Sequence, residues 1–307
     1  MTRDATVWLT PDRDEDRFLP EGPRAVTLAG REAVAWVNIQ TAADSKRGAI
    51  FARFWDTGEV RRFDRPDRPG FFVPTNRPDT LLVGAGKRLL LFNPLTGATE
   101  VLATIPDADP RTIINDGEVA PRGRAIMFGT KDVNFAEPIA HLYEFRLTDG
   151  RLTTFADGMT CSNGKVWLPD RVADIDTPKR RIDFLPPPGT DGPVPRPLDL
   201  SAEPGFPDGM VDAGDGTVIV AFYHPEPAEF GRAVRFDLLT GERLDEWRTP
   251  GSPRVTCPLL VRRPDGLKLI LTTAVEGMPE RTANAGCLFI ADAGGLNPPA
   301  AEVVRLS

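Results

Sequence analysis

The stretch Gly205-Phe206-Pro207-Asp208-Gly209-Met210-Val211-Asp212-Ala213 leads into the apolar run Thr217-Val218-Ile219-Val220-Ala221-Phe222-Tyr223. A Pro-Asp-Gly sequence favours a tight turn, and the β-branched run after it favours a strand. The same order, an acidic or amide side chain with glycine ahead of a strand, occurs at Asn115-Asp116-Gly117 and at Ser162-Asn163-Gly164. Pro264-Asp265-Gly266 shows that such a turn can also be purely structural. Three such turns, each opening a repeat, predict oxygen-bearing side chains directed at one common point.

The composition is that of a soluble globular protein. Of the 307 residues, 41% are hydrophobic and 26% are charged, and 31 prolines and 28 glycines are spread along the chain, which indicates many turns. The net charge of −7 disfavours nucleic acid or an anionic membrane as a partner. The polar start Met1-Thr2-Arg3-Asp4-Ala5 and the lack of any apolar run of about 18 residues lead us to expect a soluble cytoplasmic protein. We expect it to be a monomer or a weak homo-oligomer that acts on a small molecule.

A unit of apolar strands recurs six times along the chain, and each copy includes a tight turn with glycine. In the clearest copy, the runs 33–39 and 49–54 precede the turn Thr57-Gly58 and the run 60–63. The six turn glycines stand at positions 58, 97, 150, 192, 241 and 294, so their spacing is 39 to 53 residues. Units of about 40–50 residues with no amphipathic helix between them predict an all-β fold, a six-bladed β-propeller. A two-sheet sandwich is the alternative, but its strands need not repeat as a unit.

The predicted propeller comprises residues 1–307 as a single domain. Its blade repeats begin near residue 24, and residues 1–18 are expected to close or flank the ring.

Propeller geometry predicts where the polar turns lie. The innermost strand of each blade lines the central channel, so Asn115, Asn163 and Asp208 are expected to converge at one mouth, with the loops 131–138 and 223–230 at its rim. Lys131 and His224 in these loops are candidate substrate-binding residues, although a surface role is the simpler reading of His224.

Histidine and cysteine are too scarce for a histidine-rich zinc site. The chain has two histidines, His141 and His224, and three widely spaced cysteines, Cys161, Cys257 and Cys287, which we expect to be buried free thiols. Any metal ion must therefore be held by oxygen ligands, which suit hard cations such as calcium, magnesium or manganese.

Five short motifs carry a resemblance to a known family. They are Glu21-Gly22-Pro23 followed by Trp36-Val37-Asn38-Ile39, Asn115-Asp116-Gly117-Glu118-Val119 with Arg122-Gly123-Arg124, Ser162-Asn163-Gly164, Pro207-Asp208-Gly209 with Val211-Asp212, and Val255-Thr256-Cys257-Pro258. In this order and spacing they make the chain, from about Leu19 to the C-terminus, resemble the senescence-marker-protein/gluconolactonase family, the regucalcin-like lactonases.

The resemblance implies a six-bladed propeller with one catalytic divalent cation (calcium, zinc, manganese or iron(II)) and the hydrolysis of a sugar-acid lactone. It implies Glu21, Asn163 and Asp208 as metal ligands, with Asn115 and Asp116 beside the metal or touching the substrate. Two carboxylates and one amide oxygen would leave positions for water and a lactone carbonyl. Asp208 is the candidate general base, and Asp116 is the alternative.

One position departs from the family pattern. An arginine usually stands two residues before the Asn of Asn-Asp-Gly, where it meets the substrate, but this chain has Ile113 there, and its nearest arginine is Arg111. With Ile113 as a candidate substrate-binding residue, we predict a less hydroxylated lactone or another apolar ester, unless Arg111 or Lys131 reaches in instead. A phosphotriesterase-like metal hydrolase on the same scaffold and a non-catalytic calcium-binding propeller are the alternative functions.

Overall fold

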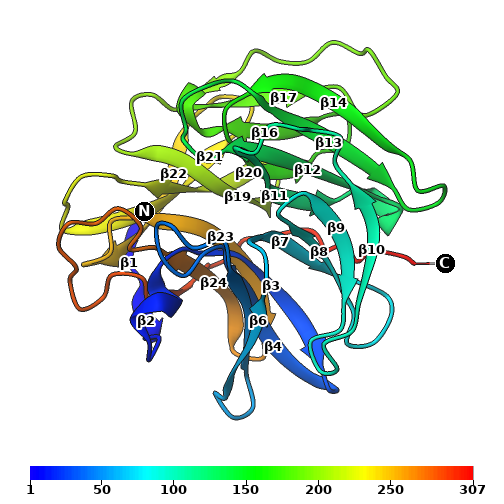
Figure 1. Cartoon of the computed structure of the whole chain (residues 1–307). Helices are drawn as coiled ribbons and strands as arrows, with labels where there is room; N and C mark the ends of the chain where they lie inside the picture. Colours follow the sequence, from blue (N-terminus) through cyan, green and yellow to red (C-terminus); the bar gives the residue numbers. More distant parts are fainter. Residues whose placement is uncertain (307) are drawn as a thin grey trace.

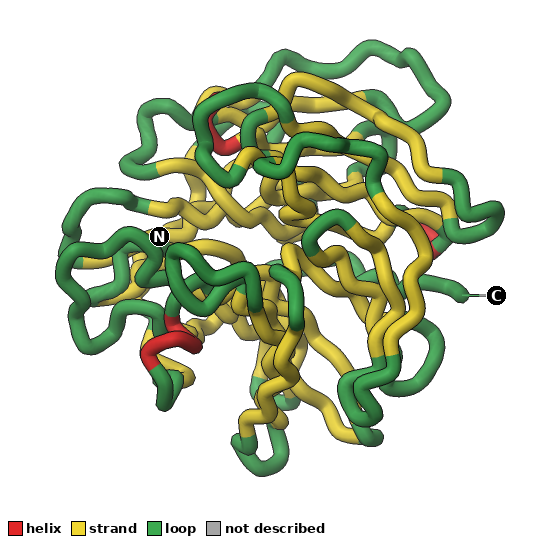
Figure 2. Tube along the Cα trace, viewed as in Figure 1, coloured by secondary structure: helices red, strands yellow, loops and turns green. Residues whose placement is uncertain are grey.

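Strands and loops make up the chain over the residues that the computed structural model describes, 1–306 (Figure 2). The helical segments in this part are three short 3-10 helices, Asp14–Arg17, Pro121–Gly123 and Thr177–Lys179. None of the helices in the described part is long and apolar enough to cross a membrane. All three cysteines are buried and free, as the sequence predicts.

Four of the six sheets contain four antiparallel strands that follow one another in sequence, and the first strand of each is innermost. Their strands are β3 (Pro20–Leu28), β4 (Arg31–Asn38), β5 (Gly48–Phe54) and β6 (Val60–Arg65); β7 (Pro69–Pro74), β8 (Leu81–Ala85), β9 (Arg88–Phe92) and β10 (Thr99–Thr104); β11 (Thr112–Val119), β12 (Ala125–Asp132), β13 (Ala140–Arg146) and β14 (Leu152–Met159); and β15 (Ser162–Trp167), β16 (Val172–Asp176), β17 (Arg181–Leu185) and β18 (Leu198–Asp199).

The other two sheets each take a strand from the N-terminus. The fifth blade has β19 (Phe206–Gly214), β20 (Thr217–Tyr223), β21 (Phe230–Asp237) and β22 (Arg243–Pro250), with β1 (Thr2–Asp4) added in parallel beside β22. The sixth has β23 (Val255–Arg263), β24 (Gly266–Thr273) and β25 (Leu288–Asp292), with β2 (Thr6–Leu9) pairing antiparallel to β25. The N-terminal segment therefore joins two neighbouring blades.

The six sheets surround a common centre as blades of a β-propeller, which confirms the predicted fold (Figure 1). The innermost strands contact one another in the order β3, β7, β11, β15, β19 and β23, and β23 contacts β3 again. The ring is therefore closed, and no blade leaves its inner edge free.

The structure differs from the prediction at one turn and at the strand expected after another. In the fourth blade the predicted turn at Asp191-Gly192 lies inside a long irregular connection, residues 186–197, and the outer strand begins only at Leu198. In the sixth blade the chain does not return as a strand after Gly294, because β2 from the N-terminus already pairs with β25 at the outer side. The proline-rich segment Leu185-Pro186-Pro187-Pro188 cannot donate a regular ladder of backbone hydrogen bonds, which explains the first difference.

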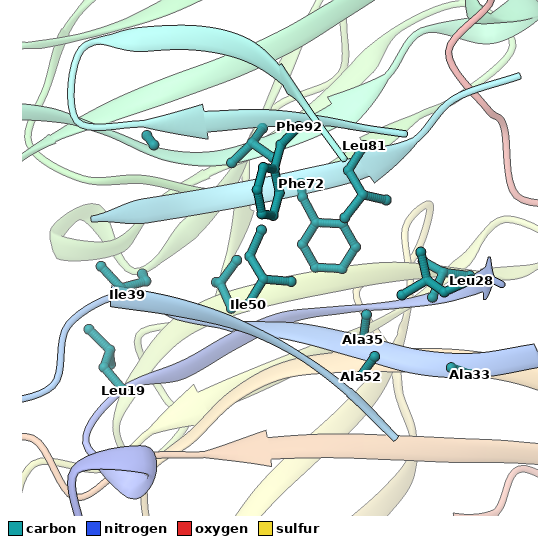
Figure 3. Close-up of a cluster of buried hydrophobic side chains, with 14 of the residues drawn as sticks. Leu19, Leu28, Ala33, Ala35, Ile39, Ile50, Ala52, Phe72, Leu81 and Phe92 are labelled. Carbon is teal, nitrogen blue, oxygen red and sulfur yellow. The ribbon is translucent and has the colours of Figure 1, made fainter. Parts of the chain in front are cut away.

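Neighbouring blades are held together by apolar side chains packed between their sheets. Figure 3 shows one such cluster, in which Phe72 and Leu81 of the second blade lie against Ile50 and Ala35 of the first. These side chains are 2% exposed or less, so each contributes roughly the 1.5–3 kcal/mol typical of a fully buried large apolar side chain, and less where it is alanine.

The Asx-Gly pairs lie within the innermost strands as β-bulges, and their prediction as turns ahead of the strands is wrong. The pairing register shifts between Ile114 and Gly117 in β11, between Ser162 and Lys165 in β15, and between Pro207 and Met210 in β19. A bulge leaves residues outside the ladder and re-aims their side chains. Three successive blades therefore carry a bulge with an Asx-Gly pair toward the N-terminal end of the inner strand.

The glycines of these bulges are required by close packing and not by a positive φ. A Cβ atom on Gly164 would clash with the backbone of Met210, and one on Gly209 would clash with the side chain of Cys257. The bulges of β15 and β19 thus lie against the next blade, and only glycine lets these inner strands approach so closely.

Candidate metal centre

A cavity of about 430 Å³ opens at the bulged ends of the inner strands. Its polar lining consists of Glu21, Asn115, Lys131, Cys161, Asn163, Thr177, Asp208 and Glu276. Its remaining walls are formed by Leu19, Ile39, Val133, Phe135, Pro178, Phe206, Tyr223 and Pro225. A larger hollow of about 870 Å³ around Trp55 and Arg262 contains none of the predicted site residues, so the chemistry is sought in the smaller cavity.

Four inner strands bring the acidic and amide side chains into this cavity. Glu21 comes from β3, Asn115 from β11, Asn163 from β15 and Asp208 from β19, each at or beside the bulge of its strand. The loops at 131–138 and 223–230 contribute Lys131, Val133, Phe135, Tyr223 and Pro225 to the walls, as the sequence predicts for the rim.

A chain of hydrogen bonds fixes Asn163. Asn115 Nδ2 donates to Asn163 Oδ1 at 2.9 Å, and Asn163 Nδ2 donates to Thr177 Oγ1 at 2.8 Å. Thr177 in turn donates to the backbone oxygen of Pro207 at 3.0 Å. This series of hydrogen bonds connects three blades. It holds the amide oxygen of Asn163 at the cavity wall with one lone pair still free.

Lys165 supports the same residue from behind. Its Nζ donates to the backbone oxygen of Asn163 at 2.5 Å and lies 3.1 Å from the carboxylate of Asp174. Both side chains of this ion pair are fully buried, and burial raises the pKa of Asp174 to about 6 although Lys165 and Ser162 act against the shift. The pair lies directly behind Asn163 and anchors the bulge of β15.

Three carboxylates line the cavity, those of Glu21, Asp208 and Glu276, and neighbouring negative charge acts on the first two. Burial raises the pKa of Glu21 well above its usual value, and the charges of Asp208 and Asp116 raise it further. Burial likewise raises the pKa of Asp208, with Lys131 opposing the shift and Asp116 and Glu276 adding to it. The cavity thus concentrates negative charge and favours a cation.

The donor set fits a hard divalent cation. Within residues 1–306, no three His, Cys, Asp or Glu side chains are grouped closely enough to hold a metal ion by themselves. The candidate set combines the carboxylates of Glu21 and Asp208 with the amide oxygen of Asn163, and all three line the cavity. Burial raises the pKa of the Cys161 thiol, so this side chain stays neutral and is a poor ligand or nucleophile. Oxygen donors of this kind suit calcium or manganese.

Three predicted residues are placed differently from the rest. Asp116 follows Asn115 in the bulge of β11 but is not in the cavity lining. Its carboxylate accepts a hydrogen bond from the backbone N–H of Gly117 at 2.8 Å. Ile113 is buried opposite Lys131 in the β11–β12 pairing and is also outside the lining. His224 is outside it as well, with its Nδ1 lying 3.0 Å from the backbone oxygen of Glu226.

Arg111 does not reach the cavity. Its guanidinium pairs with Glu137, with Nη2 3.0 Å from the carboxylate, near Asp109 and Asp132. Of the two cations considered as substitutes for the family arginine, only Lys131 lies in the lining.

Sequence reasoning missed Glu276 and Thr177 as cavity residues. Glu276 follows β24 in a segment without any repeated motif, and contacts distant in sequence hold it. The Tyr223 hydroxyl donates to its backbone oxygen at 2.7 Å, and Gln40 Nε2 donates to its carboxylate at 3.2 Å. Thr177 is recognisable only through its bond to Asn163. Such contacts between blades leave no local signal in the sequence.

Acidification should weaken metal binding earlier than for ordinary carboxylates. Because the pKa values of Glu21 and Asp208 are raised, both take up protons nearer neutrality, and a proton competes with the cation. In the metal-free protein the same two groups destabilise the folded state above their unfolded pKa values, so their contribution to stability improves as the pH falls toward about 4. Calcium titrations between pH 5 and 8 test the first expectation. Affinity independent of pH over this range would contradict it.

The fold and the cavity define the class: a six-bladed propeller with an acidic, oxygen-rich cavity at the mouth of its channel. Comparison with known proteins gives the family. The family model "SMP-30/Gluconolactonase/LRE-like region" matches residues 19–275, so the chain belongs to this family.

Individual relatives agree with this assignment. Regucalcin of Pongo abelii is 27% identical over 254 residues, which cover 79% of this chain and 80% of the relative. Among solved structures, a calcium-binding protein, regucalcin from Agrobacterium tumefaciens, matches with a TM-score of 0.79 at 21% identity over 100% of this chain and 99% of that one. A luciferin-regenerating enzyme matches with a TM-score of 0.77 at 18% identity, covering 94% and 95%. These structural matches support the fold.

Proposed function

We propose that this chain is a divalent-metal-dependent hydrolase that opens a lactone. The observation that carries the proposal is the convergence of Glu21, Asn163 and Asp208 in one cavity of a gluconolactonase-family propeller. When bound by these three residues, a divalent cation (calcium, zinc, manganese or iron(II)) supplies Lewis-acid polarisation of a carbonyl and lowers the pKa of a water molecule.

The side chains of the cavity have distinct tasks in this reaction. Asn115 orients Asn163 through the 2.9 Å hydrogen bond, so the amide oxygen faces the cavity. Asp208 accepts the proton of the attacking water, since its carboxylate lines the cavity and receives no hydrogen bond from the described residues. Asp116, the alternative base, lies outside the lining, and we assign it the lesser task of maintaining negative charge near Glu21. Ring opening by water needs no covalent intermediate with the protein.

The walls favour a substrate with an apolar body. Leu19, Ile39, Val133, Phe135 and Phe206 offer the substrate no hydrogen-bonding side chains. A polyhydroxylated ring would have to leave hydroxyl groups desolvated against these walls, which costs roughly 1–3 kcal/mol for each unpaired group. We therefore propose a less hydroxylated lactone in preference to a sugar-acid lactone.

A substrate panel tests this function. Metal-loaded protein is offered an alkyl-substituted lactone, a pentono-lactone, an aryl ester and an aryl phosphotriester in a pH-stat. We expect the alkyl lactone to have the highest kcat/KM, by about tenfold or more over the pentono-lactone, since one unpaired hydroxyl already costs that much. Faster hydrolysis of the phosphotriester would instead indicate the phosphotriesterase alternative. Metal binding without turnover of any compound would indicate a calcium-binding propeller.

A further inference from the structure

Lys131 is a largely buried side chain whose ammonium group faces the cavity without a direct partner. It lies in β12, is 8% exposed and lines the cavity. No hydrogen bond or ion pair joins its Nζ to any residue in the described part of the chain, and its closest aromatic contact is the ring of Phe135, with the ring centre 5.7 Å away. The side chain is thus largely buried while its ammonium group is accessible only from the cavity, where a ligand can supply the missing hydrogen-bond partner.

The other buried lysine of the same region shows the contrast. Lys165 is fully buried, and its ammonium is satisfied by the carboxylate of Asp174 at 3.1 Å and by the backbone oxygen of Asn163 at 2.5 Å. Lys165 therefore has a structural role. Lys131 instead directs its charge into open space that a ligand can enter.

The carboxylates of the cavity attract Lys131 only through space. Its charge lowers the pKa of both Asp208 and Glu21, but neither carboxylate lies within ion-pair distance of its ammonium group. A divalent cation held by Glu21 and Asp208 would balance the charge of these two carboxylates. The third carboxylate of the cavity, Glu276, forms no ion pair with Lys131 in the described part of the chain, so the ammonium group still faces the cavity unpaired.

We propose that Lys131 binds a carboxylate on the substrate, so that the preferred substrate is a lactone bearing a free carboxylate on an otherwise apolar body. This inference rests on the proposed lactonase function and names its substrate class. A carboxylate accepts a charge-assisted hydrogen bond from the ammonium, and such a bond is stronger between partly buried groups than between groups in free solution. The apolar body would lie against Val133 and Phe135, which follow β12 in the loop directly after Lys131.

The turnover experiment compares two lactones that differ only in charge. One is a γ-butyrolactone with a carboxylate on the ring carbon next to the ring oxygen, and the other is its carboxamide. In the metal-loaded wild type, kcat/KM for the acid should exceed that for the amide, and in Lys131→Met this ratio should fall by roughly ten- to a hundredfold. Lys131→Arg should restore part of the ratio. Lys46→Met, which removes an exposed lysine of the β4–β5 loop, should leave the ratio as in the wild type.

A binding experiment separates this inference from the proposed function. Calorimetry measures the binding of cyclopentanecarboxylate and of cyclopentanecarboxamide, neither of which can be hydrolysed, to calcium-loaded protein. We expect the carboxylate to bind more tightly in the wild type and to lose roughly ten- to a hundredfold in affinity in Lys131→Met. If no lactone is turned over but this loss is seen, the lactonase function fails and the anion site stands. If Lys131→Met binds the carboxylate as well as the wild type does, the carboxylate is held elsewhere and the proposal is overturned. The proposal is also overturned if, in the turnover experiment, Lys131→Met lowers kcat/KM equally for the acid and the amide.

Discussion

Asp208→Asn is expected to weaken divalent-metal binding by about a hundredfold and to reduce lactone turnover by about a thousandfold. The substitution removes one of two carboxylates from the donor set and at the same time the candidate base, and losses of this size are typical of a metal-site partner and of a general base. Asparagine retains the shape of the side chain, so the bulge of β19 is expected to keep its geometry. Calorimetric metal titration and steady-state kinetics give the two readouts.

The same substitution should stabilise the metal-free protein. Asp208 is 7% exposed, and its charge is disfavoured by burial and by the neighbouring carboxylates Asp116 and Glu276. Neutral asparagine removes this repulsion, so the melting temperature in EDTA should rise even as metal binding is lost. Asp191→Asn, at an exposed position in the connection before β18, is the matched control and should change neither quantity. A lower melting temperature in EDTA for Asp208→Asn would show that the carboxylate stabilises the fold instead.

Lys165→Met should be the most destabilising of the site substitutions. It leaves the carboxylate of Asp174 buried without its ion-pair partner, which typically costs 3–5 kcal/mol, or on the order of 10 °C in melting temperature. The variant also removes the hydrogen bond to the backbone oxygen of Asn163, so metal affinity should fall by about tenfold. Thermal unfolding and calcium titration measure these two effects.

A double variant separates the two effects of Lys165. In Lys165→Met with Asp174→Leu no charge remains buried, so most of the stability should return. The backbone of Asn163 still lacks its anchor, so metal affinity should stay low. Lys268→Met is the control for loss of an exposed pair, since Lys268 binds Asp292 at the surface, and its effect on both quantities should be small. Equal melting temperatures for Lys165→Met and Lys268→Met would contradict the structural role of the buried pair.

The sequence predicts the propeller because each blade repeats the same local pattern of apolar strands and glycine turns. The positions where prediction fails are those set by contacts distant in sequence. The outer strand of the sixth blade is β2, at the opposite end of the chain from β25, and no local pattern near Gly294 indicates this. The bulges at Gly164 and Gly209 resemble turns in sequence, and only their packing against the next blade distinguishes them.

In the candidate site, too, the sequence indicates some residues, while others depend on contacts that it does not show. Asn115, Asn163 and Asp208 could be selected because each stands in an Asx-Gly motif near the start of an inner strand, and Glu21 because of the family resemblance. The structure brings all four to one cavity. The unpaired state of Lys131 could not be predicted, because it depends on where Asp208 and Phe135 lie in space. Arg111 lies outside the cavity because its guanidinium pairs with Glu137, and its position in the sequence does not indicate this pairing.

Removal and return of the metal ion tests the central claim most directly. Purified protein is treated with EDTA, freed of the chelator and titrated with calcium or manganese, while hydrolysis of an alkyl-substituted lactone is followed in a pH-stat. The account predicts that hydrolysis is lost in EDTA and returns in proportion to added metal, reaching its plateau at about one equivalent, as expected for a single oxygen-ligand site. Full hydrolysis by the EDTA-treated protein would contradict it.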